Sequence, residues 1–179
     1  MKLHPESAKL FEIDEAVEKA KSYAMRLLSN RAYTRKEICD KLAGREYTQH
    51  AIDETLATLD RLNLVDDEQF ARRFAEERLR LRPSGRMVLG LDLKRRGIPA
   101  HVIDTVLDEV LEDVDVAAVA LELLMGRAKR YRGLTREKAL GRMYGFLGRR
   151  GFDSAIARDV AHQVWSTIEN EDDNDGEGL

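Results

Sequence analysis

Apolar residues recur at intervals of three and four along almost the whole chain of 179 residues, which is the period of an amphipathic helix. The first clear stripe runs from Ala16 to Leu28. No stretch alternates between apolar and polar residues, as a strand with one buried face would. The pattern therefore predicts an all-α protein, with long helices near residues 14–30, 67–82 and 115–131 and shorter helices between them.

Residues that can cap a helix stand where several of these stripes begin. Thr34 precedes Glu37 by three positions, so each side chain can bond the backbone N–H of the other residue in a capping box. Thr48 can cap the helix after it. Asp66 precedes Gln69 in the same relation, which predicts another helix start and a capping role for this acid.

The apolar pattern is itself repeated. Residues 38–56 match residues 89–107 at a spacing of 51, and residues 93–106 match residues 147–160 at a spacing of 54. The string Leu-x-Arg-Arg-Gly occurs in both later copies, directly before Ile98 and Phe152. The repeat predicts three tandem three-helix units that form an elongated, curved array. We expect an N-terminal extension over 1–13, three-helix units over 14–65, 66–114 and 115–169, and an acidic disordered tail over 170–179.

Charges are segregated along the chain, although the net charge is only −3. Residues 70–100 hold nine Lys/Arg and three Asp/Glu, and residues 126–150 hold nine Lys/Arg and a single acid, Glu137. Residues 101–118 hold six acids and no Lys or Arg, and the last eleven residues hold six acids and no base. Local patches therefore describe the electrostatics better than the total does.

The sequence lacks the usual signatures of catalysis and metal binding. Cys39 is the only cysteine, and the four histidines are scattered without an HxxxH pair. No Gly-rich phosphate loop, GxSxG or HExxH motif is present. We therefore expect no enzyme and no cofactor. No run of 18 apolar residues occurs and the first residues are too polar for a signal peptide, so we expect a cytoplasmic protein without a membrane contact.

Four stretches of the chain resemble the RecX regulatory proteins: "LLSNRAYTRKEICDKL", "LVDDEQFARRFAEERLRLRPSGR", "LKRRGIPAHVIDTVL" and "LGRRGFDSAIARDV". The resemblance covers roughly residues 16–168 and includes the order and spacing of the three units. It implies a non-enzymatic, monomeric modulator of the RecA recombinase, acting in DNA repair, recombination and the SOS response. Such a protein binds RecA and its filament on DNA and usually restrains strand exchange and co-protease activity.

Basic residues without an acid at helical spacing are the candidates for contact with DNA phosphate or with an acidic protein surface. Arg149 and Arg150 occupy the same place as Arg95 and Arg96 in the repeat, so a structural role at a helix end is the alternative for them. Tyr131 and Tyr144 could stack on bases, although their helical spacing favours the core. The candidate residues are Arg78, Arg82, Arg86, Arg127, Lys129, Arg130, Arg132, Arg136, Arg142, Arg149 and Arg150.

The main alternative is a helix-turn-helix nucleic-acid-binding protein or transcription regulator. Residues 33–67 have the apolar spacing and length of a winged-helix start. The helix that would enter the major groove carries three acids and a single base, Arg61, so phosphates would repel it. A second alternative is a helical scaffold that binds only proteins.

Overall fold

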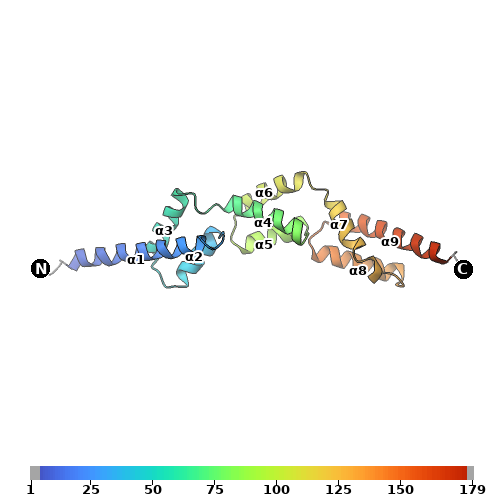
Figure 1. Cartoon of the computed structure of the whole chain (residues 1–179), viewed down its shortest axis with the longest axis horizontal. Helices are drawn as coiled ribbons and strands as arrows, with labels where there is room; N and C mark the ends of the chain where they lie inside the picture. The colour runs from blue at the N-terminus through green and yellow to red at the C-terminus, as the bar shows by residue number, and fades with distance from the viewer. Residues whose placement is uncertain (1–4, 177–179) are drawn as a thin grey trace. The chain divides into compact units, whose positions relative to one another are not determined.

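The computed structural model describes the backbone of residues 5–176 and the side chains of residues 12–171. This part of the chain forms nine α-helices, one short 3-10 helix and no strand (Figure 1). The prediction of an all-α protein built from tandem three-helix units is confirmed. The helices are α1 (Pro5–Leu28), α2 (Arg35–Ala43), α3 (Gln49–Arg61), α4 (Asp67–Leu81), α5 (Arg86–Arg95), α6 (Ala100–Glu112), α7 (Val116–Met125), η1 (Ala128–Arg130), α8 (Arg136–Arg149) and α9 (Ser154–Gly176).

The described chain divides into two compact lobes. The first lobe holds the residues up to Ala71 together with Leu93–Ile103, and the second holds Arg72–Asp92 together with Asp104 and the residues after it. Helices α4, α5 and α6 of the middle unit therefore each contribute to both lobes.

Each lobe has its own hydrophobic core. In the first lobe, α1, α2 and α3 bury fully enclosed side chains such as Ile38, Leu42 and Leu59. In the second lobe, α7, α8 and α9 enclose Leu124, Met143 and others around Trp165. Burying a Leu or Ile side chain contributes about 1.5–3 kcal/mol, so these cores hold the helices in place.

The predicted caps are present. The Thr34 hydroxyl accepts a hydrogen bond from the Glu37 N–H at 3.1 Å, and the Glu37 carboxylate accepts one from the Thr34 N–H at 3.4 Å. Thr48 caps α3 in the same way, through the N–H of Ala51. Asp66 caps α4 by accepting a bond of 2.8 Å from the Gln69 N–H. These bonds satisfy backbone donors that the first turn of a helix leaves without partners.

The repeated Arg-Gly pair joins one three-helix unit to the next inside the first lobe. The Thr34 hydroxyl donates a bond of 2.7 Å to the backbone carbonyl of Arg96, and the Arg96 guanidinium donates one of 2.7 Å to Glu37. Gly97 has φ +83°, and a Cβ there would lie 2.2 Å from the Lys36 side chain. Only glycine fits this close turn without strain.

An equivalent joint lies inside the second lobe, between the α4–α5 loop and the α8–α9 turn. The Gly85 N–H donates a bond of 2.8 Å to the carbonyl of Arg150, whose guanidinium donates one of 2.9 Å to the carbonyl of Pro83. Gly151 has φ +78°, and a Cβ there would lie 2.5 Å from the Val88 nitrogen. The second arginine of the repeated string therefore has a structural role at both joints.

At the position equivalent to Gly97, 51 residues earlier, the first unit has Glu46 at φ +61°. The chain thus keeps the left-handed backbone of this turn in all three units but places a side chain on it in the first. A non-glycine residue with this φ is uncommon.

Some boundaries differ from those expected. Helix α1 begins at Pro5 rather than near residue 14, and proline suits the first turn because its missing N–H would have no partner there. The third long helix ends at Met125, because Gly126 closes it and a 3-10 turn follows. Helix α9 continues to Gly176 and so includes most of the segment predicted to be a disordered tail; residues 177–179 lie outside the described part. Within residues 169–176, only Glu169 and Glu171 have a good helix propensity, while the Asp and Asn residues have a poor one, so the local sequence gives no helix signal there.

Candidate anion-binding cleft

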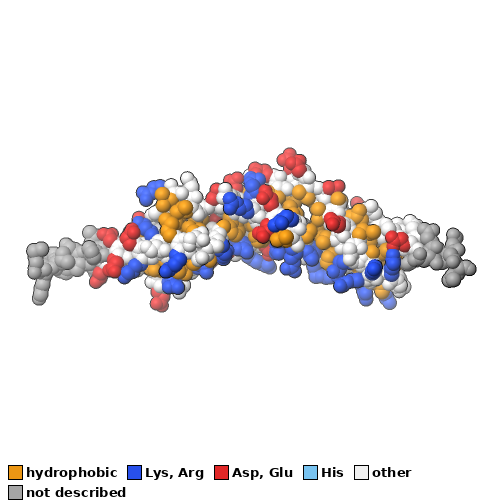
Figure 2. All heavy atoms as spheres, in the orientation of Figure 1, with side chains coloured by type: hydrophobic (Ala, Val, Ile, Leu, Met, Phe, Trp, Pro, Cys, Tyr) orange, Lys and Arg blue, Asp and Glu red, His pale blue; other side chains and the backbone are white. Residues whose placement is uncertain are grey.

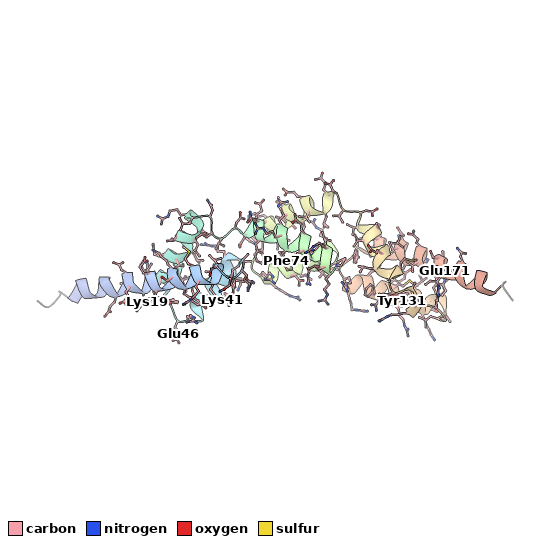
Figure 3. The ribbon with its side chains drawn as sticks, viewed as in Figure 1. Lys19, Lys41, Glu46, Phe74, Tyr131 and Glu171 are labelled. Atoms are coloured by element: carbon pink, nitrogen blue, oxygen red, sulfur yellow. The ribbon has the colours of Figure 1, made fainter. Side chains whose placement is uncertain are left out.

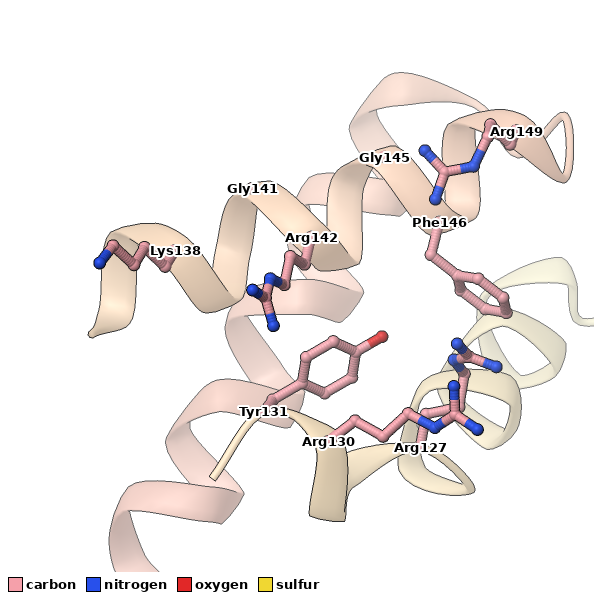
Figure 4. A pocket seen from close by; sticks show the side chains of 9 residues that line it. All are labelled: Arg127, Arg130, Tyr131, Lys138, Gly141, Arg142, Gly145, Phe146 and Arg149. Atoms are coloured by element: carbon pink, nitrogen blue, oxygen red, sulfur yellow. The ribbon is translucent and has the colours of Figure 1, made fainter. Parts of the chain in front are cut away.

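A cleft of about 600 Å³ lies between the 3-10 turn η1 and one face of α8, within the second lobe (Figure 4). Five basic side chains surround it, and most of them project into solvent or toward the space between the two elements. It is lined by Arg127, Arg130, Tyr131, Lys138, Gly141, Arg142, Gly145, Phe146 and Arg149.

Two glycines of α8 leave space for the cleft because they carry no side chain. Gly141 and Gly145 are four residues apart and therefore lie on the same face of the helix. A Cβ at Gly141 would meet nothing within 4 Å, so the helix face is open at this point. The repeat places Met87 and Leu91 of α5 at the corresponding positions, 54 residues earlier. The cleft is thus a feature of the third unit that the repeat does not impose.

The aromatic side chains form walls rather than stacking platforms. Tyr131 is only 4% exposed and belongs to the core of the second lobe. Phe146 is half-buried, and the Arg127 guanidinium lies over its ring at 4.3 Å from the centroid. Tyr144 is half-buried and its hydroxyl is 3.0 Å from Nε2 of His162. Neither tyrosine is placed to stack on a base, so the cleft can bind a ligand only through its positive charge and its shape.

A second group of cations adjoins the cleft through Arg127. Burial lowers the pKa of Arg150, and repulsion from the positive charges of Arg82, Arg127 and Arg78 lowers it further. Four guanidinium groups from three separate parts of the second lobe therefore lie within electrostatic range of one another. Like charges held together in this way favour a bound anion.

The buried atoms of this group carry unused hydrogen-bonding capacity. The Nε atoms of Arg78 and Arg127 are buried and have no hydrogen-bond partner within the described part of the chain. An unsatisfied buried donor costs about 1–3 kcal/mol, so packing holds these two guanidinium groups in place at a cost in stability.

Three of the predicted site residues are paired with acids far away in the sequence. Arg78 contacts Asp92 at 2.5 Å, and Arg86 contacts Asp108 at 2.6 Å. Arg132 forms an ion pair with Glu171, 39 residues further on. The absence of an acid at helical spacing was therefore a poor guide for these three residues, because tertiary packing supplies the partner.

The other predicted residues have no carboxylate within 4.0 Å among the residues whose side chains are described. In the orientation of Figure 2, Lys and Arg side chains gather along the lower side of the second lobe. Arg127 and Arg150 are partly buried against Phe146, and the remainder are exposed. The exposed members without an ion pair to any described side chain are Arg82, Lys129, Arg130, Arg136, Arg142 and Arg149.

Several lining residues were not among the predicted ones, namely Lys138, Gly141, Gly145 and Phe146. The pair of glycines four apart on a helix, where a gap in side-chain cover must result, was the signal that could have found them. Among the described residues, no group of three or more His, Cys, Asp or Glu side chains could hold a metal ion. In the same part of the chain, no helix is long and apolar enough to cross a membrane.

Helix α3 does not have the surface of a DNA-recognition helix. Asp53 and Asp60 are both engaged on its surface, Asp53 with Gln49 at 2.8 Å and Asp60 with Arg35 at 2.6 Å. Helix α4 follows directly, and no strand occurs in residues 5–176 to form a wing. The geometry disfavours the helix-turn-helix alternative.

Comparison with known proteins identifies the two leading units. The family description of the first three-helix domain of RecX matches residues 20–59, and that of the second three-helix domain matches residues 66–107. The solved structure of a regulatory protein RecX aligns with a TM-score of 0.78 at 21% identity, covering 95% of this chain and 79% of the other. RecX from Lactobacillus salivarius aligns with a TM-score of 0.73 at 21% identity, covering 87% and 98%. At this identity the structures support the fold.

Sequence relatives extend the match to most of the chain. The regulatory protein RecX of Chlorobium phaeobacteroides (strain BS1) is 40% identical over 147 residues, which cover 82% of this chain and 94% of the relative. That of Streptomyces lividans is 31% identical over 150 residues, covering 84% and 79%. The chain belongs to the RecX family of regulatory proteins.

Proposed function

We propose that this chain binds the RecA recombinase and its filament on DNA and restrains ATP hydrolysis, strand exchange and co-protease activity. The proposal places the protein in the cytoplasm, acting as a monomer without catalytic residues. The observation that carries it is the basic cleft of the second lobe, where Arg130, Arg142 and Arg149 are exposed and have no acidic partner among the described side chains.

The physical mechanism is obstruction guided by charge. A RecA–DNA filament presents DNA phosphate and the acidic side chains of its subunits, and either can occupy a cleft lined by guanidinium groups. Charge-assisted hydrogen bonds to phosphate or carboxylate contribute about 1.5–3 kcal/mol each. A protein held at several such points blocks the addition of subunits or the approach of a second DNA strand.

The experiment is a RecA ATPase and strand-exchange assay on single-stranded DNA, with this chain added well below one molecule per RecA subunit. Inhibition under these conditions supports binding to the filament, because free RecA would outnumber the inhibitor. Absence of any effect at every ratio, with circular dichroism showing a folded protein, would contradict the proposal.

Charge reversal locates the contact. The double variant Arg130→Glu with Arg142→Glu removes two exposed cations that make no ion pair with any described side chain, so the fold should survive. We expect inhibition to weaken by roughly tenfold or more, the equivalent of losing at least one charge-assisted contact. Arg61→Glu, a single charge reversal at an exposed position in the first lobe, is the control and should inhibit normally.

A further inference from the structure

The acidic end of α9 extends past the core that holds the helix. Ile168, which is 1% exposed, is the last residue of α9 in the core of the second lobe. The helix nevertheless continues to Gly176. Six of the last eleven residues of the chain are Asp or Glu, and none is Lys or Arg. The helix therefore carries negative charge and no apolar residue from position 169 to its end.

An ion pair ties this acidic end to the border of the cleft. Glu171 of α9 contacts the guanidinium of Arg132. Arg132 directly follows Tyr131 and is two residues after Arg130, both of which line the cleft. Figure 3 shows Glu171 and Tyr131 in the same part of the second lobe. Glu171 thus lies beside the loop that carries Arg127 and Arg130 of the cleft.

Charged groups within about one Debye length of each other interact without direct contact. The Debye length is about 8 Å at physiological ionic strength, and α9 advances only about 1.5 Å per residue beyond Glu171. The five cations that line the cleft have no carboxylate within 4.0 Å among the described side chains, so direct ion pairs do not neutralise them. Its field must lower the positive potential that a polyanion meets.

We propose that the acidic end of α9 is an intramolecular competitor that weakens the binding of polyanions to the cleft. The inference rests on the proposed use of the cleft and assigns its regulation. An incoming polyanion must compete with the negative charge of the segment for the cations of the cleft. Only a dense or multivalent anion, such as a nucleic-acid strand, therefore binds strongly. A single phosphate or carboxylate does not.

The test compares the full chain with a full-length variant carrying Asp172→Asn, Asp173→Asn and Asp175→Asn. A control variant loses three exposed acids of the first lobe, through Glu12→Gln, Asp14→Asn and Glu54→Gln, and so has the same net charge. Fluorescence anisotropy of a labelled oligothymidylate gives the dissociation constant for each protein over a salt series. The same proteins are assayed in parallel for inhibition of RecA.

We expect the α9 variant to bind the oligonucleotide about three- to tenfold more tightly at about 50 mM salt, with a smaller difference at about 300 mM salt. The control should bind as the unmodified chain does. Equal affinities for all three proteins, or an equal gain in the control, would overturn the inference.

The RecA assay separates this inference from the proposed function. Tighter oligonucleotide binding by the α9 variant, without inhibition of RecA by any of the proteins, supports the competitor and contradicts the proposed function. Inhibition of RecA by all three proteins, with equal oligonucleotide affinities, supports the proposed function and contradicts the competitor.

Discussion

The hydroxyl of Thr34 donates a hydrogen bond of 2.7 Å to the backbone carbonyl of Arg96, 62 residues further along the chain. The same hydroxyl accepts a bond from the Glu37 N–H, so one side chain both starts α2 and fixes the following unit against it. Thr34 is fully buried as a result. Because the carbonyl of Arg150 accepts from the Gly85 N–H at the second joint, the two lobes use the same arrangement with different donors.

Replacing Thr34 by valine should therefore cost more than losing a helix cap. We expect Thr34→Val to lower the free energy of unfolding by about 2–3 kcal/mol, because the cap and the bond to a buried carbonyl are both lost. Thr48→Val removes only the cap of α3 and should cost about 1 kcal/mol. Urea unfolding followed by circular dichroism compares them, and equal costs would show that the bond to Arg96 adds no stability.

The glycines of the repeated string should tolerate no side chain. Gly97→Ala and Gly151→Ala each place a Cβ on a left-handed backbone and within 2.5 Å of a neighbouring atom, so each should cost more than about 2 kcal/mol. Gly141→Ala is the matched control, because it lies inside α8 with open space around it. It should raise stability by about 0.5–1 kcal/mol. Thermal unfolding of the three variants checks the order.

The shape of the cleft can be tested without altering its charge. Gly141→Met places in α8 the residue that α5 has at the corresponding position, and its side chain should fill part of the cleft. We expect weaker inhibition of RecA with unchanged or higher thermal stability. Gly148→Met, on the same helix but away from the cleft, should inhibit normally. Full inhibition by Gly141→Met would mean that the partner does not enter the cleft.

Asp67 gives a prediction about pH. Partial burial raises the pKa of its carboxyl group, although a bond of 2.9 Å from the Arg35 N–H opposes the shift. A carboxyl with a raised folded pKa contributes stability that is present below its unfolded pKa of about 3.9 and is lost as pH rises through the folded pKa. Asp67→Asn keeps an acceptor and cannot ionise.

The melting temperature of Asp67→Asn, relative to the unmodified chain, should therefore increase between about pH 3 and pH 6. Asp14→Asn, at an exposed position of α1, serves as the control for the loss of one negative charge. A constant difference across this range would show that the ionisation of Asp67 has no effect on folding.

Local chemistry explains why the helices could be predicted. The caps at Thr34 and Thr48 act within a few residues, so their signals are complete in the sequence. The repeated string also indicated that Gly97 and Gly151 occupy equivalent turns, and both have the left-handed backbone that such a turn requires. The extension of α9 was missed because a polar segment shows no apolar stripe, whether or not it is helical. The start of α1 had a signal that was not used, because Leu10 and Ile13 continue the stripe of Val17 and Ala20 at intervals of three and four.

The charged surface could be predicted only in part. Arg86 and Asp108 are 22 residues apart, and their pairing depends on how α5 and α6 pack rather than on helical spacing. The position of a cleft depends on missing side chains as much as on those present. The basic residues alone therefore did not predict where the cleft lies. Arg130 and Arg142 were identified by charge, while the glycines that make room beside them were not.

Glu46 makes the turn of the first unit different from the two later turns. At Gly97 and Gly151, the first turn of a helix in the preceding unit, at Lys36 of α2 and Val88 of α5, occupies the space into which a Cβ would project. A side chain at position 46 takes up the equivalent space, so this turn does not offer the joint through which each later unit contacts the one before it. Joining a further unit at this turn would first require a glycine at position 46.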